Sequence, residues 1–285
     1  MAEARAVSEP APAKLNLFLS VLGRRDDGYH DIRSLIAPLT LADGVQARRG
    51  ERLLLTVVGE CAADVPRRED NLVVRAARAL AEAEGREPQA ELLLSKQIPV
   101  AAGLGGGSAD AAATLRALAR LWGLQGGPDR LREIGARVGS DVPALVEVRP
   151  AFVSGRGEVV EPADVTRTWW VLMTQRFRVG AADAYAWWDE DGGPEGADPE
   201  PLLGAIRAED VRRAGPLLSN DLEGPVAARH PEVVAAKERL LEAGAAGAVM
   251  VGSGPTVAGL VRDGFDAEGV AASTGGIAAS TITRS

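Results

Sequence analysis

The alternation of apolar and polar positions divides this chain into short strands and amphipathic helices. Apolar runs bounded by turn residues predict strands at 14–22, 53–58, 90–98, 169–174, 248–251 and 256–261. Apolar residues spaced three and four positions apart predict helices at 71–83, 131–138 and 231–243, with Asp70 or Asn71 opening the first. A further helix is expected after residue 107, with one face formed by Ala112, Leu115, Leu118, Ala119 and Trp122. Such a mixture is typical of an α/β (α+β) fold, and the acidic, Gly- and Pro-rich run 189–200 is expected to be a surface loop.

Residues 99–110, PVAAGLGGGSAD, stand where a predicted strand ends and a predicted helix begins. Glycines at 103 and 105–107 permit positive φ and let a ligand approach the backbone closely. The free N–H groups at a helix N-terminus favour an anion, and Ser108 or Asp110 is expected to cap the helix. The loop fits neither a Walker A motif, which needs Gly-Lys-Ser/Thr, nor the dinucleotide fingerprint G-x-G-x-x-G. A tight structural turn is the alternative, but this density of glycines favours phosphate binding.

Composition narrows the class of protein. A chain of 285 residues is long enough for one large domain or two modest ones. Its net charge of −8 argues against a nucleic-acid partner. The single cysteine excludes an intrachain disulfide and fits a reducing compartment, and two histidines make a His/Cys metal cluster improbable. No apolar run reaches membrane length and no signal-peptide core is present, so we expect a cytoplasmic protein without a membrane partner.

Lysine occurs only three times, so 29 of the 32 basic residues are arginine. In such a chain a lysine marks a place that needs a compact ammonium group, and Lys14 lies at the start of a strand between apolar residues. Asp141 lies two positions after Gly139 and precedes an apolar stretch, as expected where a helix ends at a cleft. A carboxylate near a lysine stays ionised and accepts a proton from a hydroxyl group. The alternatives are a strand-end lysine that reaches solvent and an aspartate that caps a helix or turn.

Tyr29 and His30 form a second candidate cluster. They are one of two tyrosines and one of two histidines, and as neighbours they offer a stacking face and hydrogen-bonding edges. Such a pair suits a planar heterocycle. An exposed hairpin turn is the alternative interpretation.

These segments occur in an order that resembles the GHMP kinase superfamily. The matching segments are PAKLNLFL (12–19), GRRDDGYHDIRSL (23–35), PVAAGLGGGSADAA (99–112), GSDVPALV (139–146), GRGE (155–158), NDLE (220–223) and GSGPTV (252–257). The glycine loop is common to the superfamily. The opening segment combined with GYH resembles those members that phosphorylate a cytidylylated methylerythritol.

The resemblance implies a two-lobed GHMP kinase fold with the substrate between the lobes. Residues 1–163 would form a lobe like the second domain of ribosomal protein S5, and residues 164–285 a ferredoxin-like lobe. The implied reaction is ATP-dependent phosphorylation of the 2-hydroxyl group of a cytidylylated methylerythritol in the non-mevalonate isoprenoid pathway, with Mg²⁺ and small-molecule partners. A homoserine or mevalonate type of kinase, and a nucleotide-binding regulatory protein without catalysis, remain as alternatives. The protein would be a monomer or a homodimer.

The resemblance also implies roles for individual residues. Asp141 would be the base and Lys14 would lie beside it. The ATP phosphate loop would comprise Pro99, Val100, Ala101, Ala102, Gly103, Leu104, Gly105, Gly106, Gly107, Ser108 and Ala109, with Ser108 as a candidate Mg²⁺ ligand. The substrate would be held by Asn16, Tyr29, His30 and Tyr185, with the 252–256 turn packed nearby from the second lobe. Two departures stand out: Ala144–Leu145 replaces common aromatic residues, and Gly180–Ala181 lacks a common Ser/Thr.

Overall fold

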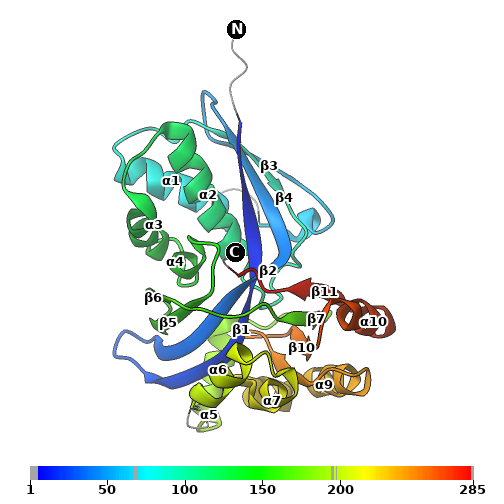
Figure 1. Cartoon of the computed structure of the whole chain (residues 1–285). Helices are drawn as coiled ribbons and strands as arrows, with labels where there is room; N and C mark the ends of the chain where they lie inside the picture. Colours follow the sequence, from blue (N-terminus) through cyan, green and yellow to red (C-terminus); the bar gives the residue numbers. More distant parts are fainter. Residues whose placement is uncertain (1–5, 67–69, 194–195, 197, 284–285) are drawn as a thin grey trace.

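The computed structural model describes residues 6–66, 70–193, 196 and 198–283 (Figure 1). The first part of the chain forms β1 (Val7–Arg24), β2 (His30–Arg48), β3 (Leu54–Val58), α1 (Leu72–Ala83), β4 (Glu91–Ser95), α2 (Gly106–Trp122), α3 (Gly127–Ala136), α4 (Val142–Leu145), β5 (Ala151–Gly155) and β6 (Val159–Pro162). The second part forms β7 (Trp169–Met173), α5 (Ala181–Glu190), α6 (Glu200–Arg207), α7 (Val211–Ala214), β8 (Ser219–Asn220), α8 (Glu223–Arg229), α9 (Glu232–Glu242), β9 (Gly247–Met250), β10 (Val257–Val261), α10 (Gly264–Thr274) and β11 (Ile277–Ser280). Among the described residues, no helix is long and apolar enough to cross a membrane.

The long hairpin of β1 and β2 is the centre of a seven-stranded sheet with the order β3-β4-β2-β1-β8, to which β5 and β6 attach through β2. Residues 11–21 of β1 are buried without interruption, because this strand is covered on both faces. On one side α2 packs against β1 and β2, α1 packs against α2, and α1–α4 lie together there in Figure 1. The alanines of α2 allow this close approach to the sheet.

A second, four-stranded antiparallel sheet has the order β11-β7-β10-β9. Helices α9 and α10 pack on it (Figure 1). The buried side chains of β7 and β10 join those of β1 and β2 in one core cluster between the two sheets. The short strand β8 pairs in parallel with β1, so the second half of the chain also contributes to the first sheet. A lobe boundary at residues 163–164 therefore stays a prediction, although it falls between β6 and β7.

Most predicted elements are present, and Asn71 caps α1 by accepting a hydrogen bond from the Val73 N–H. The predicted cap of α2 is wrong. Gly105 occupies the N-cap position in the left-handed conformation, so Ser108 and Asp110 lie within the helix. The predicted loop at 189–200 is also wrong at both ends, because α5 continues to Glu190 and α6 begins at Glu200. Residues 194, 195 and 197 of that segment lie outside the described residues.

Candidate active site

A cleft of 720 Å³ brings together residues that are far apart in the sequence. Its lining includes nine of the positions singled out from the sequence, drawn from both lobes: Lys14, Asn16, Tyr29, His30, Gly103, Gly105, Asp141, Tyr185 and Gly252. The glycine loop, the lysine–aspartate pair and the aromatic cluster therefore face one cavity. Such convergence of polar and aromatic groups on one cavity is typical of a ligand-binding site.

The glycine loop leads from β4 into the N-terminus of α2. Gly105 has φ +68°, so a residue with a side chain would be strained at this N-cap. The first N–H groups of a 17-residue helix are thereby directed at the loop, together with the positive end of its dipole. This is an anion-binding geometry.

A second cavity of 280 Å³ lies along the same loop. Pro99–Ser108 line it, whereas Ala109 is fully buried behind the loop and does not. Its other walls include the apolar side chains of Val65, Pro66 and Leu72. An apolar slot next to an anion-binding helix N-terminus has the shape and chemistry for a nucleotide base and its phosphates.

Lys14 is buried, with 5% of its surface exposed, which excludes a strand-end lysine that reaches solvent. Its backbone N–H donates to the Leu104 carbonyl at 2.9 Å, which ties β1 to the glycine loop. Its side chain runs between two glycines: a Cβ on Gly105 would lie 2.7 Å from Lys14 Cγ, and a Cβ on Gly252 would lie 2.5 Å from Lys14 Nζ. Burial lowers the pKa of the Lys14 ammonium, and the Asp141 carboxylate acts in the opposite direction.

Asn16 holds this ammonium in place. Lys14 Nζ donates to Asn16 Oδ1 at 2.6 Å, and Asn16 Nδ2 donates to Ser34 Oγ at 2.8 Å. The Ser34 hydroxyl in turn donates to the Phe18 carbonyl at 2.5 Å. Lys14 and Asn16 share one face of β1 because they are two residues apart in a strand. Both ends of the Asn16 amide are therefore fixed, and its oxygen is directed at Lys14.

Asp141 lies between α3 and α4, directly before Val142. It occupies the N-cap position of α4 but makes no capping hydrogen bond, which excludes the helix-cap interpretation. Its carboxylate faces the cleft near the Lys14 ammonium without a direct ion pair in the described part of the chain. The side chain is thus available to a ligand that enters between them.

The aromatic cluster is arranged differently from a simple Tyr–His pair. The His30 ring stacks on Tyr185, with centroids 4.8 Å apart and planes inclined by 18°. Tyr29 is half exposed, and the Arg156 guanidinium lies over its ring at 4.7 Å. Burial raises the pKa of the Tyr185 hydroxyl, with a further contribution from Asp141, so this phenol stays protonated. Two aromatic groups therefore line the cleft: the stacked His30–Tyr185 pair, with one ring from each lobe, and the Tyr29 ring.

Sequence reasoning missed three charged residues of the cleft, namely Arg24, Arg156 and Asp189. Asp189 Oδ1 accepts a hydrogen bond from His30 Nε2 at 2.9 Å, and Asp189 Oδ2 forms an ion pair with Arg24 at 3.5 Å. Arg156 lies in the GRGE segment, which was the only signal that pointed to it. Together with Lys14, the two arginines make three cations against the carboxylates of Asp141 and Asp189. In a chain of net charge −8, this balance favours an anionic ligand.

A buried ion triad supports the loop from beneath. Lys96 Nζ donates to Asp43 Oδ2 and, at 2.8 Å, to Asp110 Oδ2. Asp43 Oδ1 accepts from the backbone N–H groups of Gln97 and Ile98, where β4 passes into the glycine loop. Burial raises the pKa of Asp110 to about 7; the Lys96 ammonium acts in the opposite direction, and the neighbouring Asp43 carboxylate raises the pKa further. The triad fixes the start of the loop.

The residues present fit a magnesium ion that arrives with phosphate groups better than one held by protein alone. Among the described residues, no cluster of three or more His, Cys, Asp or Glu side chains is arranged to hold a metal. Mg²⁺ commonly keeps several waters and binds one or two protein oxygens plus substrate phosphates. Ser108, in the first turn of α2 and on the wall of the loop cavity, offers such an oxygen.

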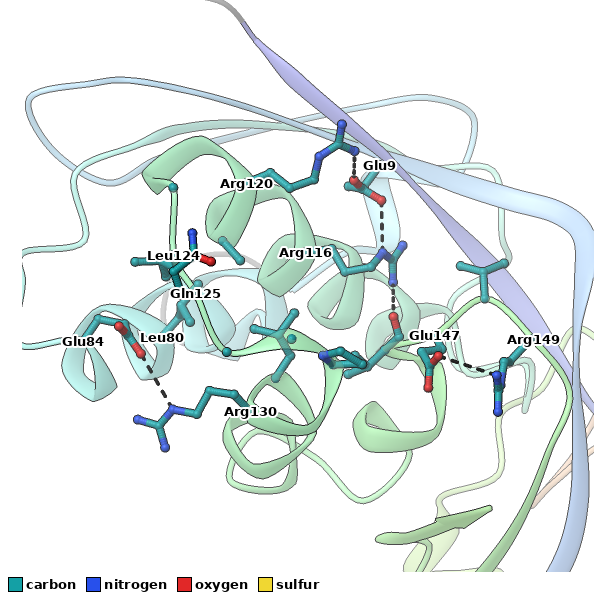
Figure 2. A pocket seen from close by; sticks show the side chains of 18 residues that line it. Glu9, Leu80, Glu84, Arg116, Arg120, Leu124, Gln125, Arg130, Glu147 and Arg149 are labelled. Atoms are coloured by element: carbon teal, nitrogen blue, oxygen red, sulfur yellow. Dashed lines mark hydrogen bonds and ion pairs between the residues drawn. The ribbon is translucent and has the colours of Figure 1, made fainter. Parts of the chain in front are cut away.

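A further cavity of 600 Å³ lies away from the predicted residues, between β1 and helices α1–α3 (Figure 2). Its arginines are paired within the protein: Arg116 and Arg120 with Glu9, Arg130 with Glu84, and Arg149 with Glu147. Figure 2 shows these pairs along its walls. Because each guanidinium there already has a carboxylate partner, this cavity is a weaker candidate for an anion than the cleft.

Comparisons with known proteins agree with this geometry. Residues 71–148 match the GHMP kinases N terminal domain, and residues 202–273 match the GHMP kinases C terminal family. The chain is 44% identical over 254 residues to the 4-diphosphocytidyl-2-C-methyl-D-erythritol kinase of Symbiobacterium thermophilum, covering 88% of this chain and 89% of that protein.

Two solved structures distinguish similarity at the level of the family from similarity of the fold alone. A crystal structure of 4-(cytidine 5'-diphospho)-2C-methyl-D-erythritol kinase superposes with a TM-score of 0.82 at 32% identity, covering 98% of this chain and all of that one. A homoserine kinase from Cytophaga hutchinsonii has a TM-score of 0.74 at 18% identity, over 99% of this chain and 96% of that one, which shows a shared fold only. The chain therefore has the two-lobed GHMP kinase fold and belongs to the family of 4-diphosphocytidyl-2-C-methyl-D-erythritol kinases.

Proposed function

We propose that this protein transfers the γ-phosphoryl group of ATP to the 2-hydroxyl group of 4-diphosphocytidyl-2-C-methyl-D-erythritol, in the non-mevalonate isoprenoid pathway. The observation that carries the proposal is the single cleft onto which the glycine loop, Lys14, Asp141 and the aromatic cluster all open. Membership of the kinase family supports the reaction class and the use of ATP. The roles of individual residues are argued below from their positions.

The nucleotide is placed with its phosphates at the N-terminus of α2 and its base in the slot beside the loop. Free N–H groups and the helix dipole stabilise the phosphate charge. The slot walls of Val65, Pro66 and Leu72 suit a purine face. Mg²⁺, bound to the phosphates with Ser108 as a protein ligand, would neutralise charge on them. The terminal phosphate then points along Gly105 into the cleft, where Lys14 lies.

Asp141 and Lys14 act on the two reacting groups. The Asp141 carboxylate accepts the proton of the substrate hydroxyl, whose oxygen forms a bond to the γ-phosphorus as the bond to the bridging oxygen of ADP breaks. The Lys14 ammonium, fixed by Asn16, stabilises the charge that develops on the transferred group. Its low exposure makes this interaction stronger than it would be in water. We assign Asn16 to positioning Lys14 at the substrate end of the cleft.

The far end of the cleft holds the cytidine diphosphate part of the substrate. His30, Tyr185 and Tyr29 offer ring faces and polar edges to the cytosine. Arg24 and Arg156 line the same end and suit the diphosphate, since guanidinium groups pair well with phosphate oxygens. Arg156 is half-buried with its guanidinium over the Tyr29 ring, and it lines the cleft, so its N–H groups are within reach of a ligand there.

The test is a coupled assay for ADP release with ATP and the cytidylylated erythritol. We expect turnover by the wild-type protein, whereas a purely regulatory nucleotide-binding protein would release no ADP. Replacing His30→Ala separates this substrate from a homoserine or mevalonate type of substrate. The variant is expected to lose affinity for cytidine diphosphate and to keep its KM for ATP. Unchanged affinity for the cytidine nucleotide would contradict the proposed substrate. The state of assembly, monomer or homodimer, stays a prediction for light scattering to decide.

A further inference from the structure

One face of α5 encloses the imidazole ring of His30. Tyr185, Trp188 and Asp189 lie at positions i, i+3 and i+4 of this helix, so their side chains project on the same side. Tyr185 stacks on the ring at 4.8 Å, and Trp188 meets it edge-on at 5.9 Å with an 85° angle between the planes. Asp189 Oδ1 lies 2.9 Å from Nε2. The imidazole is thereby held from its face, its edge and one nitrogen.

The Asp189 contact decides which ring nitrogen carries a proton. An ionised carboxylate only accepts hydrogen bonds, so Nε2 must be the donor at 2.9 Å. The second carboxylate oxygen contacts Arg24 at 3.5 Å, which orients the group further. The other ring nitrogen, Nδ1, makes no hydrogen bond within the described residues, and His30 lines the cleft. In the neutral imidazole, Nδ1 is therefore an acceptor that remains available to a ligand in the cleft.

We propose that Asp189 is a specificity-determining positioning residue, which holds His30 with its proton on Nε2 and so presents Nδ1 as a fixed acceptor to the pyrimidine of the substrate. The inference rests on the proposed function. The only hydrogen-bond donor of a cytosine base joined to ribose is its 4-amino group. Uracil carries a carbonyl acceptor at that position, and an acceptor facing an acceptor is repulsive. A fixed Nδ1 acceptor thus selects cytidine over uridine through a residue that need not touch the base itself.

The position of Asp189 also makes the selection of cytidine over uridine depend on how the two lobes are placed relative to each other. His30 begins β2 in the first sheet, whereas Asp189 lies near the C-terminal end of α5. The next residues anchor that end of α5, since Arg229 pairs with Glu190 at 3.0 Å and with Asp191 at 2.7 Å. A base that binds against His30, in the first half of the chain, therefore contacts an imidazole whose Nε2 proton is held by Asp189, in the second half.

The decisive variant is Asp189→Asn, which keeps the shape of the side chain but lets its amide either donate or accept. We expect the KM for the cytidylylated substrate to rise about tenfold, as for loss of a charge-assisted hydrogen bond. The KM for ATP and kcat should stay unchanged. The preference for the cytidine substrate over its uridine analogue, measured as a ratio of kcat/KM values, should fall by about tenfold. Glu190→Gln is the matched control, because it removes one negative charge from the next position of α5 while the Arg229–Asp191 ion pair still anchors this end of the helix and His30 is not contacted. It should behave as wild type.

A direct readout comes from ¹⁵N NMR of the imidazole nitrogens. The chain has two histidines, so a His230→Gln variant assigns both. Free wild-type protein at neutral pH should show His30 protonated on Nε2, and Asp189→Asn should show a mixture of tautomers. A proton on Nδ1 in the wild type, or an unchanged KM for the cytidylylated substrate in Asp189→Asn, would overturn the inference. Absence of wild-type turnover would instead overturn the proposed function, since the tautomer measurement needs no substrate.

Discussion

Gly252 is expected to keep the Lys14 ammonium, proposed to be catalytic, in its position. It has φ +56°, and a Cβ at this residue would lie 2.5 Å from Lys14 Nζ. Ordinary van der Waals contacts are 3.4–4 Å, so the ammonium in Gly252→Ala must move by roughly 1 Å, a displacement of the kind that lowers a rate about 100-fold. Because Nζ is the free end of a long side chain, its movement costs little folding energy, and the other close contact of this Cβ, 3.1 Å from the Gly103 carbonyl oxygen, requires a shift of only a few tenths of an ångström. It does stretch the hydrogen bond to Asn16, which is 2.6 Å in the wild type.

Gly85 provides the control for backbone strain. Its φ of +59° is nearly that of Gly252, but nothing lies within 4 Å of a Cβ placed there. Both alanine variants pay for a left-handed backbone, about 1 kcal/mol each. For a chain of this size that corresponds to a fall in Tm of roughly 3 °C. We therefore expect similar thermal shifts and very different rates.

The assay is steady-state ADP release at saturating ATP and cytidylylated substrate, with Tm measured on the same samples. Gly252→Ala should lose about two orders of magnitude in kcat, while Gly85→Ala keeps the wild-type value. If Gly252→Ala retains wild-type kcat with the same Tm shift as Gly85→Ala, the idea that this turn fixes Lys14 is refuted.

Three further predictions concern groups around the same cleft. Asp141→Asn should lower kcat by about 10²–10⁴-fold and leave nucleotide affinity nearly intact, as measured by ADP release and by titration with an ATP analogue; unimpaired turnover would exclude Asp141 as the base. The folded-state pKa of Asp110 is about 7 against an ordinary 3.8, so the folded protein keeps a proton that the unfolded chain releases between these values. Wild-type stability should therefore fall as pH rises through this window, by up to roughly 4 kcal/mol, and urea unfolding of Asp110→Asn, which leaves Lys96 paired with Asp43, should lack this slope. Asn220→Ala removes three buried hydrogen bonds: Nδ2 donates to the Met250 and Gly252 carbonyls, both at 2.7 Å, and Oδ1 accepts from the Leu222 N–H at 3.0 Å. The variant should lose about 3 kcal/mol of unfolding free energy in urea and should have a lower kcat, because the 252–256 turn is loosened. An unaltered kcat would show that this turn has no part in catalysis.

Local signals in the sequence were enough for much of this fold. Asn71 was one of two expected openings for α1, and it is the cap because its side chain reaches the Val73 N–H two residues away. The strand-to-helix position of the glycine loop was also predictable, since it depends on the adjacent apolar patterns. The grouping of Lys14 and Asp141 came from the family resemblance. Nothing local in either segment indicates that they share a cleft.

The errors have local causes as well. Ser108 and Asp110 are good capping residues, but the helix starts earlier because Gly105 takes the left-handed conformation and Gly106 is already helical. Asp189 belongs to a run rich in Gly, Pro and acidic residues, which is typical of a loop. It is helical nonetheless, because Tyr185 and Trp188 pack on His30 and extend α5 to Glu190. That packing partner lies in the first sheet, and no window of sequence around Asp189 contains it.

Most of the loop glycines, at 103 and 105–107, are required by tertiary packing as well as by the expected approach of a ligand. From the sequence, all of them served to bring the backbone close to phosphate. In the structure, a Cβ on Gly103 would lie 2.6 Å from the Gly254 carbonyl, one on Gly105 would lie 2.7 Å from Lys14, and one on Gly106 would lie 3.0 Å from Lys96 Nζ. Only Gly107 meets no neighbour closer than 3.4 Å. Three of the four positions therefore need glycine because of protein atoms beside them. The 252–256 turn of the second lobe, the buried triad and the Lys14 ammonium all contact this loop. Substitutions in the loop are therefore expected to act on catalysis even where they spare nucleotide binding.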